Sequence, residues 1–217
     1  MLLAGATGLV GGLLLQRLVQ NADVTAVIAV GRKPFSFNAP KLQTVVAPIG
    51  DWPCAIADSA PDVAISTLGT TMRAAGSQEA FVAVDHDGVL AFARGARSAG
   101  ARRFMIVSSI GAHPGSRNHY LSVKGRAEAS IQSVGFDRVD IFRPGLLRGN
   151  RKGDMRVAER VGILFSPITD FLTPHVLDHY RSIAAVDVAA AMAATLGAEE
   201  GGVFYHENRA MGALAKS

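Results

Sequence analysis

Gly5-Ala6-Thr7-Gly8-Leu9-Val10-Gly11 stands between a short apolar run and a longer run with helical spacing. Gly5 suits a tight turn, Gly8 the close approach of a diphosphate, and Gly11 the packing of the following helix against a sheet. Unpaired N–H groups at the helix start would attract an anion, aided by the helix dipole. The segment therefore predicts a dinucleotide-binding strand–turn–helix unit, and a purely structural glycine-rich turn is the alternative.

The rest of the chain alternates apolar runs of strand length with longer stretches of helical periodicity. Continuous β-branched runs are typical of parallel strands buried on both faces. This order predicts one α/β domain over residues 1–217, a Rossmann-type doubly wound parallel sheet with right-handed crossovers. Residues 145–217 are expected to contribute a small C-terminal lid and the substrate region. The expected strands are residues 1–4, 24–30, 42–47, 63–66, 104–107, 139–142, 183–186 and 203–205, and the expected helices are residues 9–19, 78–99, 120–134, 155–171 and 187–196, with a short helix or turn at 52–57.

Composition excludes several classes of protein. The 217 residues are 49% hydrophobic and 18% charged, which excludes a disordered chain. Cys54, alone of its kind, excludes a disulfide framework and is expected to be buried. Aromatic residues reach only 6%, and the basic residues behind the net charge of +4 are scattered, so we expect no nucleic-acid partner. The histidines are few and widely spaced, so we expect no metal site.

The chain also shows no sign of a membrane or a targeting signal. No apolar run approaches the ~20 residues of a membrane span. The apolar N-terminus lacks a basic region and is interrupted by glycines from Gly5 onward. We therefore expect a cytoplasmic protein with no membrane partner, either a monomer or a homodimer.

The end of the second expected strand bears on cofactor choice. NAD-preferring sites commonly place Asp or Glu there, where the carboxylate accepts from the ribose 2′-OH. This chain has Arg32 and Lys33 and no carboxylate, and two cations suit a 2′-phosphate. The pair favours NADP(H), with NAD(H) as the second choice; a solvated basic turn would leave the preference open.

Two further strand ends could contact the adenosine half of such a cofactor. Asp51 follows the third expected strand, where its carboxylate could accept from the adenine amino group. Leu68, Gly69 and Thr70 follow the fourth strand, where small residues let the backbone pass close to the ribose. Ordinary loop chemistry is the alternative for each.

Tyr120 and Lys124 form the candidate catalytic pair. At positions i and i+4 of an expected helix they share one face. A free phenol has a pKa of about 10, and a nearby ammonium favours the phenolate, which makes a phenol usable as an acid–base group near neutral pH. Ser109, at the end of the preceding strand, can hold a substrate oxygen by a hydrogen bond, and Ser108 is the alternative serine. Lys124 can also bond the ribose next to the nicotinamide.

These motifs resemble those of the short-chain dehydrogenase/reductases. The similarity is greatest to the atypical, NAD(P)H-binding branch that includes the Tat-interacting oxidoreductase-like protein, and it runs from about residue 2 to residue 210. The segments that carry it are residues 5–11, Leu68-Gly69-Thr70-Thr71, residues 76–81, Val84-Asp85, Ser108-Ser109-Ile110-Gly111-Ala112, residues 120–124 and Phe142-Arg143-Pro144-Gly145.

The resemblance implies roles for individual residues. Tyr120 would be the proton donor, Lys124 the ribose and pKa partner, and Ser109 the residue that holds the substrate oxygen. Arg32 and Lys33 match the basic pair that meets the NADP phosphate. Two departures are that Ala4 stands where the family often has Thr, and that the interval from serine to tyrosine is short. Cofactor contacts would come from Gly5, Ala6, Thr7, Gly8, Leu9, Val10, Gly11, Asp51, Leu68, Gly69, Thr70, Ser108, Tyr120, Lys124, Pro144, Gly145, Leu146, Leu147 and Arg156.

The sequence thus predicts an NADPH-dependent oxidoreductase that reduces a small carbonyl substrate by a Ser-Tyr-Lys mechanism. One alternative is an NAD(P)H-binding regulatory or sensor protein with little turnover. Another is a sugar-epimerase-like isomerase, which the short C-terminal region disfavours. His86 lies on the long expected helix beside Asp85 and Asp87, and we expect these three residues on a solvated face.

Overall fold

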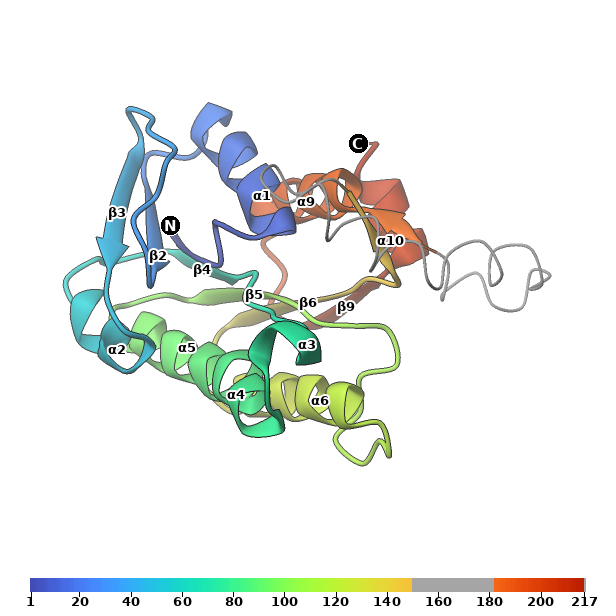
Figure 1. Cartoon of the computed structure of the whole chain (residues 1–217). Helices are drawn as coiled ribbons and strands as arrows, with labels where there is room; N and C mark the ends of the chain where they lie inside the picture. The colour runs from blue at the N-terminus through green and yellow to red at the C-terminus, as the bar shows by residue number, and fades with distance from the viewer. Residues whose placement is uncertain (150–181, 217) are drawn as a thin grey trace.

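A parallel sheet with helices on both faces forms the body of the molecule (Figure 1). The computed structural model describes residues 1–149 and 182–216, and within them seven parallel strands take the order β3-β2-β1-β4-β5-β6-β9. The strands are β1 (Leu2–Ala4), β2 (Val27–Gly31), β3 (Leu42–Val46), β4 (Val63–Ser66), β5 (Arg103–Val107), β6 (Arg138–Arg143) and β9 (Gly202–Glu207), and a separate pair is formed by β7 (Leu147–Arg148) and β8 (Ile183–Ala184). This is the predicted Rossmann-type arrangement, because the order reverses between β1 and β4.

The helices divide between the two faces of the sheet (Figure 1). The longer ones are α1 (Leu9–Gln20), α5 (Val89–Ser98), α6 (His119–Gln132), α9 (Ala185–Ala194) and α10 (Asn208–Leu214). The shorter ones are η1 (Ile49–Asp51), α2 (Trp52–Ala55), α3 (Met72–Ala75), α4 (Gln78–Val82), η2 (Ala83–Gly88) and η4 (Thr195–Gly197). Helices α1, α9 and α10 cover one face, and α2, α4, α5 and α6 lie on the other.

Alternate residues of each strand supply the two cores. Leu3, on β1, packs in the core under α1 and α9, whereas its neighbour Leu2 packs in the core with α5. In β5, Met105 and Phe104 divide in the same way. All four side chains are fully buried, which explains why these strands read as continuous apolar runs rather than as alternating patterns.

Buried charges connect the last two strands of the sheet. Arg138 donates from Nε and Nη2 to the fully buried Asp140, at 2.7 and 2.8 Å, and His206 Nε2 lies 2.9 Å from the same carboxylate. Arg143, at the end of β6, forms a two-pronged ion pair with Glu128 of α6. That pair ties α6 to the carboxyl end of β6.

The predicted helix at residues 78–99 is present but is not uniform. It runs as α4, then one stretch of π winding in η2, then α5. Single π turns inside α-helices are rare and frequently lie at functional sites. Cys54 is exposed rather than buried as expected, because α2 turns Trp52 and Ile56 toward the core instead.

The C-terminal region is only partly a separate feature. Strand β9 pairs with β6 and extends the main sheet, and α9 packs against α1 in one of the two cores. Of residues 145–217, those of α9, β9 and α10 therefore belong to the sheet and its cover. The predicted strand at 183–186 is shorter, since α9 already begins at Ala185. The predicted helix at 155–171 lies outside the described residues.

Candidate functional site

The site predicted from sequence falls at the carboxyl ends of the strands. From β1 the chain crosses to β2 on one side, while β4 lies on the other side. At such a reversal the two neighbouring connections leave in opposite directions and open a crevice, where ligands of open α/β sheets bind.

The glycine turn between β1 and α1 is packed as tightly as its predicted role requires. Gly5 has a φ of +87°, which an L side chain rarely adopts, and a Cβ there would lie 2.6 Å from Thr67 Oγ1. At Gly11 a Cβ would overlap Thr67 Oγ1 and the carbonyl oxygen of Gly5. At Gly8 the nearest such atom is the Gly5 carbonyl oxygen, at 3.1 Å. Gly5 and Gly11 thus bring α1 against the end of β4, whereas a Cβ on Gly8 would meet only the turn's own backbone.

The start of α1 suits an anion. Its N-cap is Gly8, which has no side chain to satisfy the free N–H groups, and the first turn has no acidic residue. Uncapped N–H groups with the positive end of the helix dipole form an anion site. The turn therefore fits a dinucleotide, because its small residues admit a diphosphate and its amides can bind it.

The other predicted cofactor residues lie at the same edge of the sheet. Arg32 and Lys33 directly follow β2 and are both exposed. Asp51 ends η1, after β3, and is exposed as well. Among the described residues neither cation of the pair has a carboxylate partner, so both can receive a phosphate.

Tyr120 and Lys124 lie in the first two turns of α6. Asn118 caps this helix, its Oδ1 accepting from Leu121 N at 3.2 Å, which explains why the helix begins just before Tyr120. The Tyr120 ring is half-buried and packs on the ring of Phe81, with 5.6 Å between ring centres. Lys124 is buried, although an isolated ammonium strongly prefers water.

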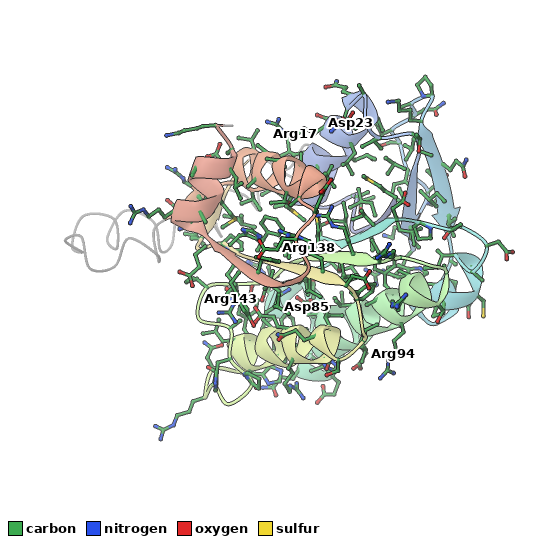
Figure 2. All side chains as sticks on the ribbon, turned by 180° about the vertical axis from the view of Figure 1, so that it is seen from behind. Arg17, Asp23, Asp85, Arg94, Arg138 and Arg143 are labelled. Atoms are coloured by element: carbon green, nitrogen blue, oxygen red, sulfur yellow. The ribbon has the colours of Figure 1, made fainter. Side chains whose placement is uncertain are left out.

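Lys124 reaches an ion partner that the sequence analysis did not identify. Its Nζ lies 2.8 Å from Oδ1 of Asp85, a fully buried residue of the π-wound η2. Oδ2 of the same carboxylate accepts from Thr70 N at 2.8 Å. Figure 2 shows Asp85 between the sheet and the helices below it. The expectation of a solvated face is therefore wrong for Asp85, whereas Asp87 is exposed as expected.

The expectation of a solvated face is also partly wrong for His86. Its side chain is 18% exposed, with Nδ1 2.7 Å from Asp87 Oδ1 and Nε2 3.1 Å from Ser130 Oγ of α6. The sequence did carry a signal for the burial of Asp85. Asp85 stands four residues after Phe81 and four before Val89, both of them core residues, so it lies on the apolar face of the helix.

The two candidate serines differ in their surroundings. Ser108 is buried, its backbone N–H donates to Phe142 O at 2.7 Å, and its hydroxyl has no hydrogen-bond partner within the described residues. Ser109 is half-buried and donates weakly, at 3.3 Å, to the carbonyl of Ile110. Neither hydroxyl is held by a strong hydrogen bond within the described residues, so both remain candidates.

The segment after β6 borders the same edge. Ile110 N donates to Pro144 O at 3.0 Å, which joins the loop after β5 to the loop after β6. Gly145 N donates to Asn208 Oδ1 at 3.0 Å, and Leu147 enters β7. Pro144, Gly145, Leu146 and Leu147 are thus placed where the sequence predicts the cofactor backbone contacts. Arg156, the remaining predicted contact, lies outside the described residues.

Two negative findings hold for the described part of the chain. No three metal-ligating side chains of His, Cys, Asp or Glu gather there. None of its helices has the length and apolar character needed to cross a bilayer.

Comparisons with known proteins identify the family of this chain. A family model described as NAD(P)H-binding matches residues 5–199. Protein fmp52, mitochondrial, of Emericella nidulans is 37% identical over 171 residues, covering 76% of this chain and 73% of the relative. Protein HTATIP2 of Rattus norvegicus is 36% identical over 152 residues, covering 68% of this chain and 62% of the relative. The resemblance to the Tat-interacting branch is thereby confirmed.

Among solved structures, MoeE5 in complex with UDP-glucose and NAD superposes with a TM-score of 0.70. The two are 15% identical, and the match covers 94% of this chain and 74% of MoeE5. At this identity the likeness bears on the fold, and it confirms the predicted Rossmann-type sheet.

The expected cytoplasmic location is wrong by these comparisons. The relatives from the fungi Emericella nidulans, Coccidioides immitis and Aspergillus clavatus all carry names that call them mitochondrial. The expectation depended on the absence of a recognisable leader in an apolar, glycine-interrupted segment. That segment is β1 and the turn after it, and burial of this strand accounts for its apolar composition.

Proposed function

Because the chain belongs to the NAD(P)H-binding family, we propose that it is an NADPH-dependent reductase of a small carbonyl compound. The family supports a pyridine-nucleotide-binding, oxidoreductase-like protein; the choice of NADPH, the substrate class and the Ser-Tyr-Lys mechanism are the proposal. The observation that carries it is the buried ammonium of Lys124, one helical turn from Tyr120. A Cβ on Gly69, just beyond β4, would lie 3.6 Å from Lys124 Nζ, so the ammonium lies at the ligand-binding edge.

Several elements would hold the cofactor. The amides at the start of α1 bind the diphosphate, and Arg32 and Lys33 bind the 2′-phosphate. An ammonium has three N–H donors, and those of Lys124 can serve ribose hydroxyls while its charge is paired with Asp85. When bound, the reduced nicotinamide supplies the hydride.

The chain's own residues would handle the carbonyl oxygen. The Tyr120 phenol delivers a proton to that oxygen, and the hydroxyl of Ser109, or of Ser108, donates a hydrogen bond that holds it in place. The pair of Arg143 and Glu128 keeps α6, and therefore Tyr120, against the carboxyl end of β6. Orientation of this kind can account for a large part of an enzymatic rate.

Cofactor choice is tested by fluorescence titration of the purified protein with NADPH and NADH. We expect tighter binding of NADPH, and we expect Arg32→Ala to remove most of the difference, because NADH has no 2′-phosphate for the guanidinium to meet. Arg17→Ala is a matched control, since Arg17 is an exposed arginine on the last turn of α1 and lies on no predicted contact. Equal affinities of the wild type for the two dinucleotides would contradict the role of the basic pair.

Turnover is tested by following NADPH absorbance with a panel of small aldehydes and ketones. Tyr120→Phe should remove turnover and leave the NADPH affinity within about twofold, because it deletes one oxygen from a ring that still packs on Phe81. Lys124→Met should weaken both turnover and binding. Binding without turnover on every carbonyl would favour a dinucleotide-binding regulator instead.

The second candidate is an isomerase that acts on a sugar nucleotide. The likeness to MoeE5, solved with UDP-glucose and NAD, favours it. Such an enzyme would oxidise and re-reduce its substrate and so show no net change in NADPH. Conversion of UDP-glucose to its epimer by this chain would decide for the isomerase.

A further inference from the structure

The contacts of Asp85 go beyond what the Ser-Tyr-Lys constellation needs. This carboxylate is fully buried: Oδ1 forms an ion pair with Lys124 Nζ, and Oδ2 accepts a hydrogen bond from Thr70 N, each at 2.8 Å. Taking two charges out of water costs free energy that mutual attraction repays only in good geometry, so a buried pair is weak evidence for stability. A role other than stability is therefore the better explanation.

The three partners come from three separate elements. Asp85 belongs to the π-wound η2, Lys124 to the catalytic helix α6, and Thr70 to the loop after β4. The N–H of Thr70 has no role in a helix or strand, and the carboxylate is its acceptor. Asp85 thus joins the loop expected beside the adenosine half of the cofactor to the lysine expected at its other ribose.

We infer that Asp85 is a positioning residue: it holds Lys124 Nζ at the cofactor's nicotinamide ribose and links that ammonium to the loop at Thr70. The inference depends on the proposed function for the ligand itself. Because the buried Asp85 carboxylate lies 2.8 Å from Lys124 Nζ and balances its charge, it fixes where the ammonium lies. Asp85 lies in the π-wound stretch between Phe81 and Val89, which are both core residues.

The two links can be separated by substitution. In Asp85→Asn the amide oxygen can still accept from Thr70 N, but no carboxylate remains for Lys124. In Asp85→Ala both links are lost. Asp87→Asn is the matched control, because Asp87 lies two residues away in the same π turn, has the same charge, and is exposed.

The measurement is the affinity of each variant for two probes, NADPH and 2′,5′-ADP, which lacks the nicotinamide ribose. Asp85→Asn should weaken NADPH binding about tenfold, because the ammonium loses the charge that holds it in place, and should leave the affinity for 2′,5′-ADP unchanged. Asp85→Ala should weaken both probes, and Asp87→Asn neither. Wild-type affinity of Asp85→Asn for NADPH, or an equal loss for both probes, would overturn the inference.

A double-mutant cycle asks whether Asp85 acts through Lys124. Adding Asp85→Asn to Lys124→Met should cause no further loss of NADPH affinity, since no ammonium remains to be positioned. A further tenfold loss in that background would overturn the inference. If Asp85→Asn alone does not fold, Asp85→Glu serves in its place, because it keeps the charge but moves the carboxylate. The affinity for NADPH should then fall, and the affinity for 2′,5′-ADP should not. An unchanged affinity for NADPH would count against the role of Asp85.

The same data separate this inference from the proposed function. A folded wild type that binds neither probe removes the proposed function and this inference with it. A wild type that binds both, with an Asp85→Asn variant that binds NADPH equally well, removes only the role of Asp85.

Discussion

Gly8, Gly11 and Gly12 lie close together at the start of α1, yet a methyl group added to each meets different surroundings. At Gly11 it would overlap the carbonyl oxygen of Gly5 and the hydroxyl of Thr67. At Gly12 the nearest atom is a backbone carbonyl oxygen 3.4 Å away, close to an ordinary contact. At Gly8 the only atom near the methyl would be the Gly5 carbonyl oxygen, at 3.1 Å, and Gly8 is the N-cap at which the diphosphate is expected. The three Gly→Ala variants therefore separate packing from ligand binding.

The magnitudes follow from the local geometry. Alanine is favoured over glycine inside a helix by about 1 kcal/mol, so Gly12→Ala should raise the melting temperature by about 2–4 °C. Gly11→Ala gains the same propensity but overpacks against backbone atoms, at a cost of about 3 kcal/mol. The net loss of about 2 kcal/mol corresponds to a melting temperature about 4–8 °C lower. Gly8 is the N-cap, where alanine costs only up to ~1 kcal/mol.

Thermal unfolding with and without NADPH, supported by fluorescence titration, distinguishes the three variants. At about 100 times its Kd, a ligand stabilises the folded state by about 2.7 kcal/mol, and the wild type and Gly12→Ala should both show that shift. Gly8→Ala should fold and show little shift with NADPH. A Gly8→Ala variant that binds NADPH as the wild type does would refute the assignment of this turn to the diphosphate, and a Gly11→Ala variant as stable as the wild type would refute the packing argument.

Two other predictions concern the buried ion pairs at the end of the sheet. Burial raises the pKa of Asp140, but hydrogen bonds from His206 and Arg138 lower it more, so the pKa lies below its ordinary value. The contribution of Asp140 to stability is then complete above about pH 4 and is lost as the pH falls toward its folded-state pKa. Urea unfolding between pH 3 and 7 should show this decline. Asp140→Asn leaves Arg138 buried without its carboxylate, so it should cost about 3–5 kcal/mol at pH 7 and remove most of the pH dependence. Glu128→Gln removes the charge that raises the pKa of Arg143 and should cost about 1–3 kcal/mol, measured by the same unfolding, while an unchanged stability would show that the pair does not hold α6.

Sequence patterns identified the elements that local physics controls. Continuous apolar runs located the strands, because strands covered on both faces have no polar side. The spacing of Gly5, Gly8 and Gly11 predicted a turn that the structure packs as expected, with Gly5 at positive φ and Gly11 against it. Helical periodicity located Tyr120 and Lys124 on one helix. Each of these inferences needs only neighbours within a few residues along the chain.

The partner of Lys124 shows what such patterns miss. Asp85 and Lys124 are far apart in sequence, and their contact depends on how η2 and α6 pack on the same face of the sheet. Helical periodicity placed Asp85 four residues from Phe81, on the buried side, but charge alone suggested solvent. Burial of a carboxylate depends on a counter-charge, and a counter-charge from another element is visible only in three dimensions.

By itself, the amino-acid order determined the strand–turn–helix that begins the fold, the parallel sheet, and the residue types at each strand end. These follow from backbone sterics, glycine geometry and hydrophobic periodicity, which all act locally. Only the tertiary structure decided that Lys124 is buried against Asp85, that β9 extends the sheet while α9 covers it, and that Arg143 holds α6 through Glu128. Those outcomes depend on which segments, far apart in the sequence, pack on one another and exclude water from the groups between them. Such packing is a property of the folded chain and not of any one segment.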